Sequence, residues 1–201
     1  MTRVGAVIPA AGRSRRMGRS KPLLPLGESD FVGTLVAALQ APDVGAAPIV
    51  VVHRSDDAPL ATRLAAMDGV VGVTVPPDDG DMLRSVRVGA AALGDAAGAL
   101  VWPVDAPGVA PRTVASVMSA ARAHPHRVCQ PRHEDAPGHP IYVPAPLFQV
   151  SPTPDAAPGL RGLLEAAGAP VRPVLVRDPG CLRNVNTPDE YEALQRALAR
   201  G

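Results

Sequence analysis

The sequence has few of the features that mark several common classes of protein. Aromatic residues make up 2% of its 201 residues, which argues against a base-stacking platform for single-stranded nucleic acid. A formal net charge of +1 gives no overall attraction to nucleic acid or to a membrane surface. No apolar stretch approaches the roughly 20 residues of a membrane span. We therefore expect neither nucleic acid nor a membrane as a partner.

Cysteine is also scarce, with Cys129 and Cys181 as the two examples. Two cysteines are too few for a disulfide scaffold, and free thiols in the cytoplasm are the simplest interpretation. The apolar run Val4–Ile8 follows three residues that lack the layout of a signal peptide. We therefore expect a cytoplasmic protein.

Lysine is the rarest charged residue, since it occurs once, at Lys21, against nineteen arginines. The two cations are not interchangeable, because lysine carries a compact charge on a flexible stem and arginine carries a planar fork. Lys21 ends a basic, glycine-containing loop, residues 9–21, that follows the first apolar run. A lone lysine beside small residues indicates a phosphate-binding group. Chance survival in an arginine-rich composition is the alternative.

Short apolar runs alternate with helical periods along the chain. Runs rich in β-branched residues predict strands over residues 4–8, 49–53, 70–75, 99–104, 127–130, 139–143 and 171–176. Apolar residues recur at i, i+3, i+4 and i+7 over residues 32–39, 114–121 and 160–167, and less regularly over 60–67 and 82–93. This alternation predicts a three-layer α/β fold, in which helices cover both faces of a mostly parallel sheet.

The length of the chain favours a single domain over residues 1–201. The proline-rich stretch 131–158 breaks the alternation and predicts an excursion over one edge of the sheet. A final helix has a clear start at Thr187-Pro-Asp-Glu190, which combines a threonine cap, proline at the first helical position and a glutamate three residues on.

Polar residues follow three of the predicted elements. They are the loop at residues 10–21, Asp105 after an apolar strand, and Asn186 before the final helix. In open α/β sheets, ligands bind beyond the carboxyl ends of the strands. Backbone N–H groups of small residues can approach a phosphate closely, and a carboxylate can hold Mg²⁺ that also binds the phosphates. These are the parts needed for phosphoryl or nucleotidyl transfer.

Other motifs are weaker. The loop is not a Walker A motif, because Gly18 is followed by Arg-Ser before Lys21, and it lacks the Gly-x-Gly-x-x-Gly of a dinucleotide fold. A histidine and cysteine group matches no standard zinc spacing, and we expect solvated histidines at His124, His126 and His133. Asp78, Asp79 and Asp81 form an acidic loop. This loop either caps the next helix or contacts a nucleoside.

Residues 10–21 read Ala-Ala-Gly-x-Ser-x-Arg-Met-Gly-x-x-Lys, which resembles the signature loop of nucleotidyltransferases with a glycosyltransferase-A-like fold. Within that superfamily the chain looks most like the molybdenum cofactor cytidylyltransferase branch, the MobA-like NTP transferases. Further similar segments are Leu23–Gly27, Gly80–Gly89, Val104–Pro107, Gly138–Pro140, Gly159–Leu164 and Asn184–Pro188. The resemblance covers nearly the whole chain.

The resemblance implies a role for each matching residue of the loop. Backbone at Ala10, Ala11 and Gly12 would hold the nucleobase and the phosphates. Arg16 and Lys21 would bind the β- and γ-phosphates and stabilise the departing pyrophosphate.

The remaining roles are implied for residues outside the loop. Asp105 would be catalytic and would hold Mg²⁺ together with Asn186. Ser85 would lie near the nucleoside, and His139 would lie on the acceptor side. The structural alternatives are an ordinary helix residue for Ser85, a strand residue for His139 and a turn residue for Asn186.

The implied activity is Mg²⁺-dependent transfer of a nucleoside monophosphate from CTP to molybdopterin, with release of pyrophosphate. A molybdoenzyme that receives the cofactor is the implied protein partner. The branch usually has aspartate where this chain has Asn184 and Asn186, and asparagine at the second position is found in guanylyl- and sugar-nucleotidyltransferases. The alternatives are therefore GTP as donor, a sugar phosphate or methylerythritol phosphate as acceptor, and a non-catalytic nucleotide-binding cofactor chaperone.

Overall fold

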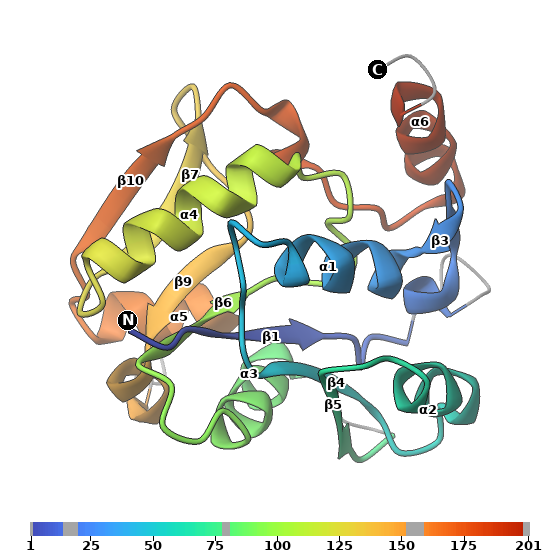
Figure 1. The fold of residues 1–201 in the computed structure, drawn as a ribbon, viewed down its shortest axis with the longest axis horizontal. Helices are drawn as coiled ribbons and strands as arrows, with labels where there is room; N and C mark the ends of the chain where they lie inside the picture. The colour runs from blue at the N-terminus through green and yellow to red at the C-terminus, as the bar shows by residue number, and fades with distance from the viewer. Residues whose placement is uncertain (1, 14–19, 78–80, 152–158, 199–201) are drawn as a thin grey trace.

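The protein is built around a central mixed sheet (Figure 1). The structure is a computed structural model, and it describes residues 2–13, 20–77, 81–151 and 159–198. Its strands lie side by side in the order β10-β7-β9-β6-β1-β4-β5. Their bounds are β1 Gly5–Pro9, β4 Ile49–Arg54, β5 Val70–Val75, β6 Gly98–Val101, β7 Val128–His133, β9 Ile141–Pro144 and β10 Val171–Leu175. Each matches a strand predicted from the sequence.

Three short strands were not predicted. β8 (Ala136–Pro137) pairs with the end of β7, while β2 (Pro25–Leu26) and β3 (Ser29–Asp30) form a separate two-stranded hairpin. With two residues each, they are too short to show an alternating pattern.

Parallel pairing dominates the sheet. β1 is parallel to both β4 and β6, β4 is parallel to β5, and β7 is parallel to β10. β9 is antiparallel to both of its neighbours, β6 and β7. The mostly parallel α/β fold is therefore confirmed.

The expected excursion over a sheet edge is wrong for residues 141–144, which form β9 inside the sheet. All four of these residues are buried. An Ile-Tyr-Val run that is buried on both faces is most stable between two other strands, because there its backbone groups are paired as well.

Helices cover both faces of the sheet, as predicted. One hydrophobic cluster includes side chains of α1 (Phe31–Gln40), α2 (Ala58–Ala65), α4 (Pro111–Ala123) and α6 (Pro188–Leu198). A second cluster, on the opposite face, includes side chains of α3 (Met82–Ala91), α5 (Gly159–Ala166) and the 3-10 helix η2 (Ala145–Gln149). No helix in the described ranges is long and apolar enough to cross a membrane.

Strand β1 shows how one run serves both clusters. Ala6 and Ile8 contribute to the first cluster and Val7 to the second, as the alternation of side chains along a strand requires. Gly89 brings α3 close to this strand, since a Cβ at position 89 would lie 2.6 Å from Val7 Cγ1 and 2.8 Å from Val52 Cγ2. Helix α3 is thus held directly against β1 and β4.

A buried carboxylate joins the C-terminal part of the chain to α4. Asp178 is 5% exposed, and its Oδ2 accepts hydrogen bonds from Ala110 N at 2.9 Å and Thr113 Oγ1 at 2.7 Å. Its Oδ1 accepts from Gly180 N at 2.9 Å. Ala110 precedes α4 and has no capping group of its own, so Asp178 supplies the cap from a distant segment.

We expect Asp178→Ala to lower the free energy of unfolding by about 2–4 kcal/mol, because it leaves three donors without their acceptor, two of them at one helix start. Urea denaturation of the variant measures the loss. Asp189→Ala is the control, since Asp189 is an exposed acidic residue in the first turn of α6, where substitution should cost less than about 1 kcal/mol. Equal losses in the two variants would contradict the capping role of Asp178.

Candidate active site

The candidate site lies where β1 and β6 end. The chain after β6 stays beside β1, because Trp102 N donates to Val7 O at 3.0 Å and Val104 N donates to Pro9 O at 3.3 Å. The indole Nε1 of Trp102 then donates to Ala106 O at 2.9 Å, which closes the turn around Asp105. The Asp105 carboxylate therefore lies at the edge of the sheet where β1 and β6 end.

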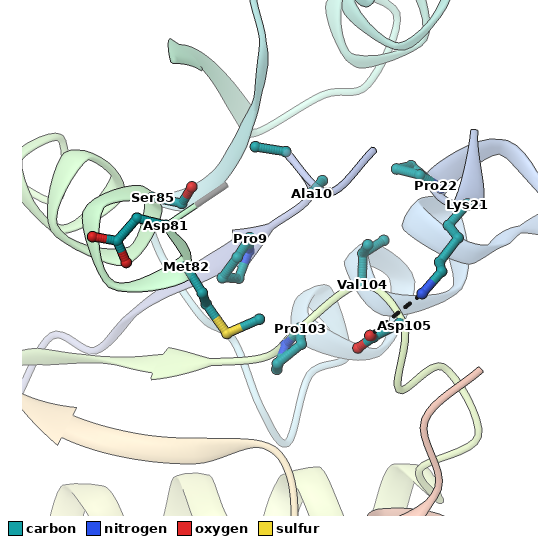
Figure 2. Close-up of a pocket in the computed structure, with 12 residues that line it drawn as sticks. Pro9, Ala10, Lys21, Pro22, Asp81, Met82, Ser85, Pro103, Val104 and Asp105 are labelled. Atoms are coloured by element: carbon teal, nitrogen blue, oxygen red, sulfur yellow. Dashed lines mark ion pairs between the residues drawn. The ribbon is translucent and has the colours of Figure 1, made fainter. Parts of the chain in front are cut away.

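A pocket opens between these strand ends and the start of α3 (Figure 2). Most of the residues predicted for the site line it, and they are Ala10, Ala11, Gly12, Lys21, Ser85 and Asp105. The predicted Arg16 lies outside the described residues. Pro9, Pro22, Asp81, Met82, Pro103 and Val104 complete the lining.

Lys21 contacts both predicted metal ligands, Asp105 and Asn186, at one end of the pocket. Its Nζ donates a 2.7 Å hydrogen bond to Asn186 Oδ1 and lies 3.6 Å from Asp105 Oδ2. The side chains of Lys21 and Asp105 are only 12% and 21% exposed. The second carboxylate oxygen, Asp105 Oδ1, is buried and has no hydrogen-bond partner within the described part of the chain. Three residues from distant parts of the sequence thus converge on one point.

Backbone contacts fix the position of Asn186. Val185 N donates to Asp105 O at 2.6 Å, which ties the segment before α6 to the turn after β6. The Glu190 carboxylate accepts from Asn186 N at 2.6 Å and from Thr187 N at 2.9 Å, and Glu190 N donates to Thr187 Oγ1 at 3.3 Å. The predicted capping box is therefore confirmed, and it holds the residue that contacts Lys21.

The other end of the pocket is formed by α3. Ser85 is 3% exposed and lies one turn after Asp81, whose Oδ1 accepts from Leu83 N at 2.8 Å. Asp81 is thus the cap of α3 and also lines the pocket, while Asp78 and Asp79 lie outside the described residues. Figure 2 shows Asp81 and Ser85 across the pocket from Lys21 and Asp105.

Two arginines form hydrogen bonds that involve the start of the loop after β1. Arg13 donates to Pro77 O through Nε at 3.3 Å and through Nη2 at 3.1 Å. Arg54 donates to Gly12 O at 3.4 Å and pairs with Asp56 at 2.8 Å. Arg54 was not among the residues predicted for the site, although it directly follows a predicted strand, where ligands bind in such sheets.

His139 does not line the first pocket. It lines a second one between α5 and strands β7, β9 and β10, whose walls include Gln130, Ile141, Leu160 and Arg161. Burial lowers the pKa of the His139 imidazole below its ordinary value, and the negative charge of Asp105 only partly opposes that shift. Its Nδ1 is buried and has no hydrogen-bond partner among the described residues. His139 is therefore neutral at pH 7.

The cysteines and the remaining histidines form no centre within the described residues. Cys129 and Cys181 are both free and buried, and burial raises the pKa of each thiol, so neither is a ready thiolate. No three histidine, cysteine or acidic side chains in the described ranges gather closely enough to bind a metal ion. A metal ion bound at Asp105 would therefore need further oxygen ligands from an amide, water or substrate.

Residues 6–171 match the MobA-like NTP transferase domain, and the chain belongs to this family of nucleotidyltransferases. Among solved structures, it is 28% identical to Rv0371c from Mycobacterium tuberculosis H37Rv, with a TM-score of 0.76 over 97% of this chain and 99% of that one. A manganese complex of Rv0371c gives 26% identity and a TM-score of 0.73 over 98% and 100% of the two chains.

A nucleotidyl transferase from a Methanothermobacter species has the same fold, with a TM-score of 0.81 and 23% identity over 100% of this chain and 99% of that one. Among curated proteins, none matches the sequence. Sequence, fold and family together make the chain a nucleotidyltransferase.

The lowered pKa of His139 leads to a pH-dependent stability. Its folded pKa lies below the unfolded value, so this histidine contributes stability above the unfolded pKa, and that contribution is lost as pH falls toward the folded pKa. We expect the wild type to lose more stability than His139→Gln between pH 8 and pH 5. Urea denaturation at several pH values measures both, and parallel curves for the two proteins would contradict the prediction.

Proposed function

We propose that the chain transfers a nucleoside monophosphate from a nucleoside triphosphate to a phosphorylated acceptor and releases pyrophosphate. CTP is the leading donor and molybdopterin the leading acceptor. The observation that carries the proposal is the convergence of Lys21, Asp105 and Asn186 at the strand ends. An ammonium group among oxygen ligands, beside a loop of small and basic residues, suits a triphosphate, whose transfer depends on positioning and on charge neutralisation.

The residues fit a divalent metal ion, and we propose Mg²⁺. Asp105 Oδ1 is a buried carboxylate oxygen without a partner in the described ranges, and Asn186 Oδ1 already faces a cation. Both are hard oxygen donors, and substrate phosphates and water would complete the coordination. The manganese complex of the related Rv0371c supports a divalent ion. When bound, the metal would neutralise the negative charge that develops on the phosphates.

The proposed reaction is an in-line displacement. An oxygen of the acceptor phosphate forms a bond to the α-phosphorus while the bond from that phosphorus to the β-phosphate oxygen breaks, and the electron pair leaves with pyrophosphate. Lys21 stabilises the charge on the departing group. Arg16, which matches the family loop, is its proposed partner in contacting the β- and γ-phosphates.

The two pockets suggest where the substrates bind. The backbone of Ala10–Gly12 and the side chain of Ser85 would hold the nucleotide in the first pocket. The acceptor would approach from the second pocket, where His139 is neutral and can hydrogen-bond without adding charge to an already anionic complex. Molybdopterin as acceptor would make a molybdoenzyme the final recipient of the product. We further propose that residues 1–201 act as one domain.

The donor and acceptor can be tested together by measuring pyrophosphate release. We expect release from CTP, in the presence of Mg²⁺ and molybdopterin, to exceed release from GTP, ATP or UTP. Preference for GTP would favour guanylyl transfer, which the neutral Asn186 makes the second candidate. Pyrophosphate release with a sugar phosphate or methylerythritol phosphate, but not with molybdopterin, would identify that compound as the acceptor instead. No release with any combination would favour a nucleotide-binding chaperone.

The metal role of Asp105 gives a second test. Asp105→Asn should keep the fold and lower Mg²⁺-dependent turnover by about 10²–10³-fold, the scale of losing one preorganised electrostatic group. Asp56→Asn is the matched control, because Asp56 is an exposed carboxylate that pairs with Arg54 and does not line the pocket, and its turnover should stay near wild type. An unchanged Mg²⁺ titration for Asp105→Asn would remove Asp105 from the site.

A further inference from the structure

The Lys21 ammonium lies between the two side chains that we propose as metal ligands. It bonds Asn186 Oδ1 at 2.7 Å and lies 3.6 Å from Asp105 Oδ2, so it touches the same two side chains proposed as metal ligands. Because Lys21 and Asp105 are mostly buried, solvent screens this interaction less than it screens a surface ion pair. A divalent cation and this ammonium cannot both sit between Asp105 and Asn186.

The contacts of Asn186 explain why Lys21 is held there. Asn186 is positioned by the capping box and by the bond from Val185 N to Asp105 O, independently of any ligand. Its neutral amide oxygen accepts from the ammonium and adds no negative charge that would attract a divalent ion. Asp105 therefore supplies the negative charge that faces the Lys21 ammonium, and Lys21 neutralises it.

We propose that Lys21 is a built-in competitor of the metal and that the nucleotide removes it. A bound triphosphate offers the ammonium stronger partners than an amide and a shared carboxylate. When Lys21 moves to the phosphates, Asp105 and Asn186 are released for the cation. Metal binding and nucleotide binding are then positively coupled, and the coupling is reciprocal. The inference rests on the proposed metal site and adds the order in which that site is completed.

The test is binding of Mn²⁺ alone to the nucleotide-free protein, measured by electron paramagnetic resonance. We expect Lys21→Met to bind Mn²⁺ about 5- to 150-fold more tightly than wild type, the usual range of coupling between two sites. Methionine keeps an unbranched side chain of similar length and removes the charge. Lys21→Gln is the second variant, and melting temperatures establish that each variant is folded.

Arg54→Met is the matched control for net charge. Arg54 is a nearby cation whose contacts are with Gly12 O and Asp56 rather than with Asp105 or Asn186. Its loss should leave Mn²⁺ affinity within about 2-fold of wild type, the change that weak long-range charge effects produce in salt. An equal gain in Arg54→Met and Lys21→Met would overturn the proposal, since it would mean a general charge effect.

Two further results separate this inference from the proposed function. Unchanged or weaker Mn²⁺ binding by folded Lys21→Met and Lys21→Gln would overturn the competitor role, while loss of binding in Asp105→Asn would leave the metal site standing. A gain in Lys21→Met that persists in the double variant with Asp105→Asn would place the ion elsewhere. That outcome would overturn both the competitor role and the metal site.

Discussion

The contact of the Lys21 ammonium with oxygen atoms of Asp105 and Asn186 joins three segments of the candidate site. Lys21 comes from the loop after β1, Asp105 from the turn after β6, and Asn186 from the segment before α6. Asp105 reaches that point because β6 ends shortly before it, and Asn186 because the start of α6 fixes the segment before that helix. The parallel pairing of β1 with β6 brings the first two ends to the same edge, and the bond from Val185 N to Asp105 O adds the third.

The scaffold behind the site is built from small aliphatic side chains on both faces of the sheet. With few aromatic residues, close packing depends on short contacts between backbone and small side chains, such as the approach of α3 to β1 at Gly89. Helix α3 carries Ser85 and is capped by Asp81, so this approach also sets the width of the pocket at the end opposite Lys21 and Asp105. A core that is packed in this way positions its loops without large side chains beneath them.

Much of the fold could be predicted from the sequence because the main strands and helices have regular apolar patterns. In the described part of the chain, the strands of the main sheet other than β8 and the helices α1 to α5 follow those patterns, and the capping box predicts the start of α6. The position of β9 could not be predicted, since its apolar run is equally compatible with an edge or with the centre of a sheet. The cap that Asp178 provides for α4 was also hidden, because the two segments are joined only by the tertiary fold.

For the site, the sequence predicted most of the residues that line the first pocket but not how they contact one another. Residues 10–21 were predicted to bind phosphate, and the family resemblance implied that Asp105 and Asn186 bind a metal ion. The direct bond from Lys21 to Asn186 has no sequence pattern, since it joins residues at opposite ends of the chain. Arg54 was missed for a similar reason, because its contact with Gly12 depends on the neighbouring strands β1 and β4.

The antiparallel strand β9 has a consequence for how the chain folds. It separates β7 from β6, so the pair β7 and β10 joins the parallel strands β6, β1, β4 and β5 only through it. At the centre of the sheet, Gly5 pairs with Ala99, and Ala99 pairs with Val143. Such non-local pairs require the closure of long loops before they contribute stability. A substitution that weakens β9 would therefore slow the joining of the two halves of the sheet more than it would disturb either half.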